Sequence, residues 1–406
     1  DEGPNVQKIF IFFIILELNL NLFNYLKINN HLTQKNKQYL KILLYCSNNE
    51  HYHTYIFYMI KVGINGFGRI GRSITRLICD TRDIKLLVVN EIDQDIKNLA
   101  YLIKYDSIYG KLKKTVKINK NKNVIQISNN RIKFFSKKNI TEVNWDKFDL
   151  DLVIDASGVG KNVIDSKKIL NKKLSKVIIT HSPDRHVDNT LIIGANEKSY
   201  NYKKQHVISS SICDASALAP VLCELDKNFG IKKGFITTLH PRLSYQNLLD
   251  GSLSSVSSPG HNWKDYSLGR DSIANLIPKN TTAIKAVNKC LKNLSGKIDG
   301  ISFRVPTSIV CGSDLTIELK KDTSVEKISK FFKNLSKTKS RIFGFQEDSL
   351  VSIDHMGTTK SVIIDSNYIK ILNKNLLKMV IWYDNECGYS NRVLDIVRYI
   401  LKKNDK

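Results

Sequence analysis

The first orderly pattern of apolar and polar residues begins near residue 60, where short apolar runs alternate with segments of helical spacing. Apolar strands are predicted over residues 60–65, 86–89, 152–154 and 176–180. Helical spacing of apolar side chains follows the first strand, over residues 70–78. Because strands that alternate with helices of this length run parallel, we expect a parallel α/β sheet in the first part of the chain.

A glycine-rich turn joins the first predicted strand to the helix. The turn reads Gly66-Phe67-Gly68-Arg69-Ile70-Gly71. Glycines at this spacing permit a tight turn, let the backbone approach a pyrophosphate and let the helix pack on the strand. Glu91 ends the next strand region, where a carboxylate accepts hydrogen bonds from ribose hydroxyls and repels a 2′-phosphate. The pattern favours an NAD site over an NADP site, and the alternative is a glycine turn with a surface glutamate.

Small polar residues follow two later strands of the predicted sheet. Ser157 and Gly158 come after the strand at 152–154, and Thr180 ends the strand at 176–180. Ligands of such sheets lie beyond the carboxyl ends of the strands. We therefore expect these residues near the cofactor, although each one is also an ordinary turn former.

A cysteine and a histidine stand at the ends of predicted elements. Cys213 lies at the start of a helix that runs to about Gly230, where the partial positive charge of the helix end stabilises a thiolate. His240 ends the predicted strand at 234–240 and can act as the base for such a thiol. The alternatives are a buried cysteine that only packs and a structural histidine.

The composition of the chain indicates how many domains it forms and in which cellular compartment it works. The 406 residues are 42% hydrophobic and 25% charged, which excludes a disordered chain and favours two domains. The net charge of +25 would suit phosphate-bearing partners, but Arg supplies only 12 of the 63 basic residues and the charge is diffuse, so no dedicated nucleic-acid partner is predicted. The seven cysteines contain no Cys-x-x-Cys pair, so we expect no metal site and a reducing, cytoplasmic compartment.

The first 58 residues differ from the rest of the chain. They contain no Arg and no Ala, and their apolar run at 9–16 is too short to span a bilayer. Neither a secretory signal nor a transit peptide fits this composition. We interpret 1–58 as an extension that is disordered or non-native, such as translated upstream sequence, and expect no membrane partner; the alternative is an amphipathic or membrane-touching arm.

Six segments of the remaining chain, in the same order, resemble glyceraldehyde-3-phosphate dehydrogenase. They are Lys61 to Arg72, Tyr105-Asp106-Ser107, Cys213 to Pro220, Thr237 to His240, Phe303 to Thr307 and Trp382 to Arg392. The resemblance implies an α/β fold with an N-terminal Rossmann NAD-binding domain at 59–212, completed by a C-terminal helix at about 385–406. It also implies an α+β catalytic domain at 213–384 with a largely antiparallel sheet, and a homotetramer.

The resemblance further implies the site and its glycolytic reaction. Cys213 is then the nucleophile, His240 its partner, and Asn385 holds the nicotinamide carboxamide of NAD. The implied cofactor-binding set is Gly66, Phe67, Gly68, Arg69, Ile70, Glu91, Ser157, Gly158, Thr180, Asn385 and Tyr389. The implied substrate and phosphate set is Asp214, Arg270, Thr281, Thr282 and Arg304, with no metal. The partners would be a phosphorylated aldehyde and inorganic phosphate, joined through a Cys213 thioester to give an acyl phosphate.

Several positions depart from the family's usual pattern, including Ala215, Ser216 and Ala217 after the cysteine and Cys387 in place of a Phe. Ile212 replaces a Ser, Asp214 and Leu243 each replace a Thr, and Thr282 replaces a Gly. A carboxylate at 214 can cap the helix, but it raises the thiol pKa and repels phosphate. The alternatives are therefore a related dehydrogenase that uses erythrose 4-phosphate or a different acyl acceptor, and a weakly active paralogue with a binding role.

Overall fold

The structure is a computed structural model that describes residues 41–45, 53–57, 59–252 and 265–402. In the first part of the chain, β1 (Lys41–Tyr45) and β2 (His53–Phe57) pair antiparallel as a sheet of their own. The other residues of the expected extension at 1–58, including the apolar run at 9–16, lie outside the described residues.

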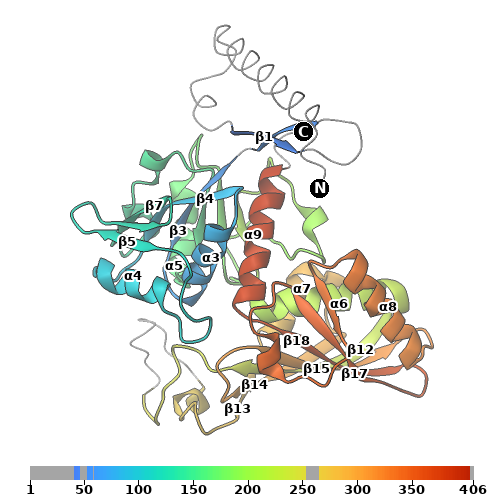
Figure 1. Cartoon of the computed structure of the whole chain (residues 1–406). Coiled ribbons are helices and arrows are strands. Elements are labelled where there is room, and N and C mark those ends of the chain that lie inside the picture. Colours follow the sequence, from blue (N-terminus) through green and yellow to red (C-terminus); the bar gives the residue numbers. More distant parts are fainter. Residues whose placement is uncertain (1–40, 46–52, 58, 253–264, 403–406) are drawn as a thin grey trace, which may run out of the picture. The chain divides into compact units, whose positions relative to one another are not determined.

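The first large sheet follows the predicted alternation of strands. Its strands are β3 (Ile60–Asn65), β4 (Ile84–Asn90), β5 (Val116–Asn119), β6 (Val124–Ile127), β7 (Asn130–Phe135), β8 (Leu152–Asp155), β9 (Lys176–Ile179), β10 (Asn189–Thr190) and β11 (Val207–Ser209). They lie in the order β10-β11-β9-β8-β3-β4-β7-β6-β5 (Figure 1). Pairs β3–β8, β4–β7 and β8–β9 are parallel, whereas β6 is antiparallel to both β5 and β7. The four strands predicted from the sequence are confirmed as β3, β4, β8 and β9.

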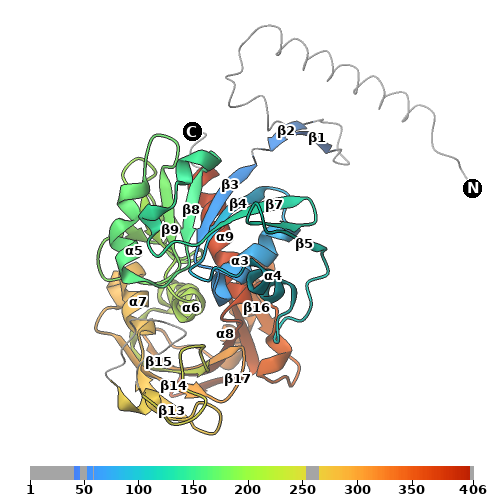
Figure 2. The same ribbon diagram turned by 90° about the vertical axis from the view of Figure 1, so that its left-hand side faces the viewer.

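The order in which strands are added to this sheet changes direction at β3. Figure 2 shows β8 and β9 on one side of β3, with β4 and β7 on the other. Gly66 follows β3 with a φ of +98°, and a Cβ placed on it would lie 2.6 Å from the backbone nitrogen of Ser157, which follows β8. Gly158 also has a positive φ, of +70°. At this switch point, where such sheets bind ligands, Gly66 therefore permits a close approach of the two turns, and Gly158 permits a left-handed backbone conformation.

Helices cover the first sheet and connect it to the second. They are α3 (Arg69–Asp80), α4 (Ile96–Lys104), α5 (Gly160–Asp165) and the C-terminal α9 (Cys387–Lys402). Short 3-10 helices are η1 (Ile140–Glu142), η2 (Trp145–Phe148), η3 (Ser166–Ile169) and η4 (Glu197–Ser199). Ile74 and Ile78, one turn apart on α3, are buried, as the helical spacing predicts. Helix α9 contacts both α3 and α6 (Cys213–Phe229), so the C-terminus returns to the first sheet (Figure 1).

The second sheet is largely antiparallel. Its strands are β12 (Ile231–Pro241), β13 (Ile277–Asn280), β14 (Ile298–Val305), β15 (Cys311–Leu319), β16 (Phe343–Gln346), β17 (Val362–Leu372) and β18 (Leu376–Tyr383). They lie in the order β13-β14-β12-β15-β18-β17-β16, and only β12–β14 and β16–β17 are parallel pairs. A first sheet that is parallel apart from the β5-β6-β7 edge, together with a largely antiparallel second sheet, confirms the expected fold class.

Helix α6 occupies the centre of the second core. With α7 (Ala283–Cys290) and α8 (Val325–Thr338) it lies over the second sheet (Figure 1). The other 3-10 helices are η5 (Tyr266–Gly269), η6 (Lys292–Leu294) and η7 (Ser352–His355). Leu218, Val221 and Leu222 of α6 are fully buried. Burying a side chain of this kind stabilises the folded state by about 1.5–3 kcal/mol relative to leaving it exposed. This packing fixes α6 within the core of the second sheet. Within the described ranges, no helix is long and apolar enough to cross a membrane.

Candidate active site

Cys213 and His240 form a close pair, as the sequence predicts. Cys213 is the first residue of α6, and its Sγ lies 3.6 Å from Nε2 of His240 near the end of β12. The other ring nitrogen, Nδ1, lies 2.8 Å from the carbonyl oxygen of Pro241. Because a carbonyl only accepts, Nδ1 carries the proton and Nε2 turns a lone pair toward the thiol. Burial, and then the charge of Arg304, lowers the pKa of His240 to about 4, so the imidazole is a neutral base at pH 7.

The carboxylate of Asp214 is held beside the thiol. Its Oδ1 lies 3.9 Å from Sγ of Cys213, and the hydroxyl of Tyr383 donates to the same oxygen at 2.6 Å. Burial first and the negative charge of Asp214 second raise the pKa of Cys213 well above its ordinary value. Tyr383 is a residue that sequence reasoning missed, because nothing in the local pattern of β18 relates it to a helix end far back in the chain.

The same side chains form a group of possible metal ligands. Donor atoms of Cys213, Asp214 and His240 all lie within 4.8 Å of one another. Sulfur, nitrogen and carboxylate oxygen are the ligands that zinc accepts in proteins. Sequence spacing contained no sign of this grouping, because the fold alone brings β12 to the start of α6.

The structure separates the two predicted anion-binding arginines. Arg304 is buried on β14, directly opposite His240 of β12, and its Nη2 donates to the hydroxyl of Tyr245 at 3.3 Å. Arg270 is exposed and forms an ion pair with exposed Asp250 at 2.8 Å. Arg304 therefore lies at the Cys213 pair, whereas Arg270 already has a counter-ion at the surface.

Two of the other predicted anion-binding positions, Thr281 and Thr282, lie at the start of α7, and the departure at Leu243 follows β12. Thr281 is half-buried, and its Oγ1 accepts a hydrogen bond from the backbone nitrogen of Ala283 at 3.0 Å. Thr282 is exposed and forms the N-cap position of α7. Leu243, whose backbone nitrogen donates to Gln246, is half-buried and offers no hydroxyl. Only the threonines therefore retain side-chain oxygens for an anion.

The glycine turn fits a dinucleotide cofactor. A Cβ on Gly71 would lie 2.1 Å from the carbonyl oxygen of Gly66, whereas a Cβ on Gly68 would meet no atom within 4 Å. The turn is thus closed toward the protein and open toward the ligand side. Buried Phe67 directs its backbone nitrogen to the Glu91 carboxylate at 2.5 Å, which holds Glu91 at this turn. The residues present therefore fit a pyrophosphate and an adjoining ribose.

Buried polar residues join the strand ends behind this turn. Asn65 donates to Asp155 at 2.9 Å and accepts from Asn90 at 2.8 Å, so β3, β4 and β8 are linked at their carboxyl ends. Burial raises the pKa of Asp155. Ser157 donates to Oδ1 of Asp155 at 2.7 Å, and the backbone nitrogen of Thr180 donates to the Asp155 carbonyl at 3.0 Å. Sequence reasoning located Ser157 and Thr180 at this edge but missed the three residues that hold them.

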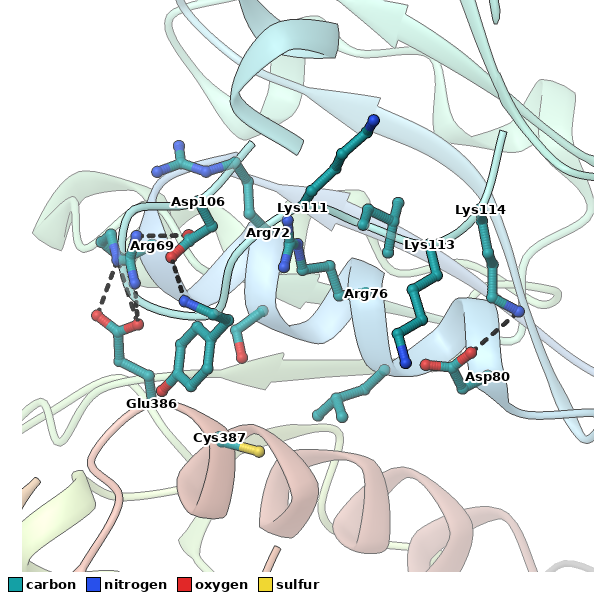
Figure 3. Close-up of a pocket in the computed structure, with 14 residues that line it drawn as sticks. Arg69, Arg72, Arg76, Asp80, Asp106, Lys111, Lys113, Lys114, Glu386 and Cys387 are labelled. Carbon is teal, nitrogen blue, oxygen red and sulfur yellow. Dashed lines mark hydrogen bonds and ion pairs between the residues drawn. The ribbon is translucent and has the colours of Figure 1, made fainter. Parts of the chain in front are cut away.

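Arg69 connects the glycine turn to a distant part of the chain. Figure 3 shows its guanidinium between Asp106 and Glu386, at 2.6 and 2.5 Å. These side chains border a pocket of about 300 Å³ that lies along α3. Its lining residues are Arg69, Arg72, Ser73, Arg76, Leu77, Asp80, Asp106, Tyr109, Lys111, Leu112, Lys113, Lys114, Glu386 and Cys387. Ile70, next to Arg69, is half-buried. The arginine predicted to bind cofactor therefore ties the turn to Glu386.

Two predicted cofactor residues lie at the start of α9. The backbone nitrogen of Val310 donates to Oδ1 of buried Asn385 at 3.1 Å, which orients the side-chain amide. The hydroxyl of Tyr389 contacts Oγ of Ser210 at 2.8 Å and donates to the carbonyl of Ser211 at 3.0 Å. Tyr389 thus fixes the loop that leads into Cys213.

Comparison with protein families gives two matches that together span most of the chain after residue 59. Residues 60–163 match the model described as "Glyceraldehyde 3-phosphate dehydrogenase, NAD binding domain". Residues 212–385 match the model described as "Glyceraldehyde 3-phosphate dehydrogenase, C-terminal domain". The first match contains the glycine turn, and the second contains Cys213 and His240.

Individual relatives are similar in sequence to this chain over nearly their whole length. Glyceraldehyde-3-phosphate dehydrogenase 1 of Bacillus cereus is 35% identical over 346 residues, which is 85% of this chain and 99% of the relative. The enzyme of Buchnera aphidicola is 38% identical over 345 residues, with the same coverage. Glyceraldehyde-3-phosphate dehydrogenase 1 of Kluyveromyces lactis is 37% identical over 343 residues, 84% of this chain and 100% of the relative. Similarity of this extent, together with an NAD-binding first domain, shows that the chain belongs to the glyceraldehyde-3-phosphate dehydrogenase family.

Proposed function

We propose that this chain oxidises glyceraldehyde 3-phosphate with NAD and inorganic phosphate, through a thioester on Cys213, to an acyl phosphate. The observation that supports this most directly is the 3.6 Å approach of Cys213 Sγ to Nε2 of a neutral His240. The names of the relatives supply the substrate, and the first domain supplies the cofactor.

The proposed chemistry begins with proton transfer inside this pair. As the thiol proton of Cys213 moves to Nε2 of His240, sulfur attacks the aldehyde carbon, a C–S bond forms and the carbonyl electrons move to oxygen. The imidazolium and the backbone amides at the start of α6 stabilise that alkoxide. When bound, NAD accepts the hydride that leaves this carbon as the carbonyl reforms. The resulting thioester is attacked by a phosphate oxygen, the C–S bond breaks, and the Cys213 thiolate leaves as the acyl phosphate forms.

We assign the cofactor contacts to three parts of the chain. Backbone amides of the turn around Gly68 would face the pyrophosphate, and the Glu91 carboxylate would accept from the ribose hydroxyls. The oriented amide of Asn385 would hold the nicotinamide carboxamide. The open side of the turn and the fixed carboxylate support this assignment.

The Cys213→Ser variant tests the covalent mechanism. An alcohol is a far poorer nucleophile near neutral pH, so we expect NADH formation to disappear while NAD binding, measured by fluorescence titration, stays within about twofold. The matched control is Cys290→Ser, since Cys290 is also a free thiol and its Sγ donates to a backbone carbonyl, that of Thr190. Substantial turnover by Cys213→Ser would reject the thioester.

Asp214 specifically favours a second candidate, in which the acyl acceptor or the aldehyde differs. A carboxylate 3.9 Å from the reacting sulfur opposes an approaching phosphate. Rates with glyceraldehyde 3-phosphate and erythrose 4-phosphate, each with and without phosphate, distinguish these reactions. A rate of NADH formation that is the same with and without phosphate would assign water as the acyl acceptor. No turnover with either aldehyde would favour a weakly active paralogue that binds another partner.

We also propose the organisation and location of the enzyme. The NAD-binding domain would be 59–212, completed by the C-terminal helix, and the catalytic domain 213–384. All six cysteines of the described ranges are free thiols, which supports a reducing, cytoplasmic location. A homotetramer is proposed from the family, and light scattering of the purified chain tests it.

A further inference from the structure

Lys279 lies on the face of the second sheet that carries the reactive residues. In β13, Lys279 is directly opposite Ser302 of β14, and Ser302 is opposite Thr238 of β12. Opposite residues project from the same face, and Thr238 donates to Oγ of Ser302 at 2.8 Å. Two residues further along the same strands, Arg304 and His240 form the next row of this face. Lys279 therefore shares a face with the base of the Cys213 pair.

The positive charges on this face have unused hydrogen-bond donors. Lys279 is half-buried, and no described residue forms a hydrogen bond or ion pair with it. Arg304 is 7% exposed, and its buried Nε also has no hydrogen-bond partner among the residues that the structure describes. Burial lowers the pKa of Lys279, the charge of Arg304 lowers it further, and the charges of Asp214 and Asp265 raise it. Asp265 is exposed to water and already accepts two hydrogen bonds from Ser267, whereas Asp214 is buried. Two cations with free donors thus lie near one buried carboxylate.

We propose that Lys279, together with Arg304, binds a phosphate group beside Cys213 and offsets the negative charge of Asp214. The proposal rests on the proposed function, since it assumes that a phosphate group reaches the Cys213 site. Without Lys279, the formal charges of Arg304 and Asp214 cancel, so the pair exerts no net electrostatic attraction on an anion. With Lys279, the formal charges of Arg304, Lys279 and Asp214 sum to +1, which attracts the anion that Asp214 by itself would repel, because water screens the charge of exposed Asp265.

The phosphate group has two possible carriers in this reaction. Free inorganic phosphate would be the acyl acceptor, and the phosphate ester of the aldehyde would be part of the substrate. Both present the same oxygen atoms to a lysine, so the experiment has one arm for each.

A purely structural role for Lys279 makes a different prediction. The aliphatic stem of a lysine can cover apolar surface while its charge reaches water. Lys279→Met keeps a stem of similar length and removes the charge, whereas Lys279→Arg keeps the charge. Loss of binding in the methionine variant with recovery in the arginine variant therefore reports charge and not packing. Exposed Lys292, on η6, becomes the matched control as Lys292→Met.

The first arm needs no turnover. Iodoacetamide alkylation of Cys213 in the full-length protein is followed by mass spectrometry at increasing inorganic phosphate concentration. We expect the concentration that halves the alkylation rate to rise about tenfold in Lys279→Met, to recover in Lys279→Arg and to stay unchanged in Lys292→Met. Equal protection of the wild type and Lys279→Met would overturn the proposal, as would the absence of protection in the wild type.

The second arm assigns the carrier by steady-state kinetics. A rise of about tenfold in the KM for inorganic phosphate alone assigns the acyl acceptor, and a similar rise in the KM for the aldehyde alone assigns the substrate phosphate. Unchanged values of both constants would overturn the proposal. If the wild type oxidises no aldehyde, the proposed function fails, but the alkylation arm still decides whether Lys279 binds phosphate.

Discussion

The charge of Asp214 next to the Cys213 thiol leads to a quantitative prediction. Its Oδ1 lies 3.9 Å from Sγ of Cys213. Two unit charges at this distance interact by about 1 kcal/mol in water and by about 4 kcal/mol at an effective dielectric constant of 20. The interaction opposes the thiolate, and the negative charge of Asp214 is the second cause, after burial, of the raised pKa of Cys213.

Asp214→Asn removes this charge with little change in shape. The asparagine oxygen can still accept the hydrogen bond that Tyr383 donates at 2.6 Å, so the side chain should keep its position. Below the thiol pKa, the alkylation rate follows the fraction of thiolate. We therefore expect the iodoacetamide reaction of Cys213 at pH 7 to become about tenfold faster or more, since about 1.4 kcal/mol corresponds to a factor of ten. The KM for inorganic phosphate should fall in the same variant.

A full pH profile of Cys213 alkylation, read from the modified peptide, is the measurement. Asp299→Asn is the control, because Asp299 is an exposed carboxylate of β14. Thermal unfolding of each variant verifies the fold. If the alkylation profile of Asp214→Asn lies at the same pH as that of the wild type, or at higher pH, the reasoning is refuted. Asp214 would then not act on the thiol through its charge.

Three further predictions follow from contacts elsewhere in the fold. Gly71→Ala should destabilise the protein by about 2 kcal/mol or more, because its Cβ would lie 2.1 Å from the Gly66 carbonyl; Gly68→Ala, with no atom within 4 Å, should keep stability within about 1 kcal/mol but lower NAD affinity about tenfold. Arg69→Ala should reduce the free energy of unfolding by about 1–3 kcal/mol, since two carboxylates lose their shared partner. Burial lowers the pKa of Lys176 to about 8 from 10.5, so between these values the unfolded chain binds a proton that the folded chain does not, and stability should rise with pH.

Urea unfolding and NAD titration measure these effects. The glycine prediction fails if both variants lose stability equally or if Gly68→Ala binds NAD as the wild type does. The arginine prediction fails if Arg69→Ala unfolds at the wild-type urea concentration. For Lys176 the control is Lys176→Met, which should lack the rise in stability between pH 8 and 10.5; a rise of the same size in this variant would assign it to other groups.

Local patterns of the sequence were sufficient to predict the glycine turn and a cysteine at the start of a helix. The turn from Gly66 to Gly71 and the position of Cys213 at a helix start depend on a few neighbouring residues and on backbone sterics. Short apolar runs and the helical spacing of apolar residues over 70–78 similarly predicted β3, β4, β8, β9 and α3. These features are local, so their physical causes are present in the sequence itself.

Contacts between distant strands and helices were decided only by the tertiary structure. The pairing of Asp214 with Tyr383, of Arg69 with Glu386 and of Lys279 with the face of His240 depends on sheet order and register. The two-residue period of a strand predicts which residues share a face, but it does not predict which strand lies beside it. Strand neighbours are chosen by the packing of the whole core around α6, and that choice determines the charges around Cys213.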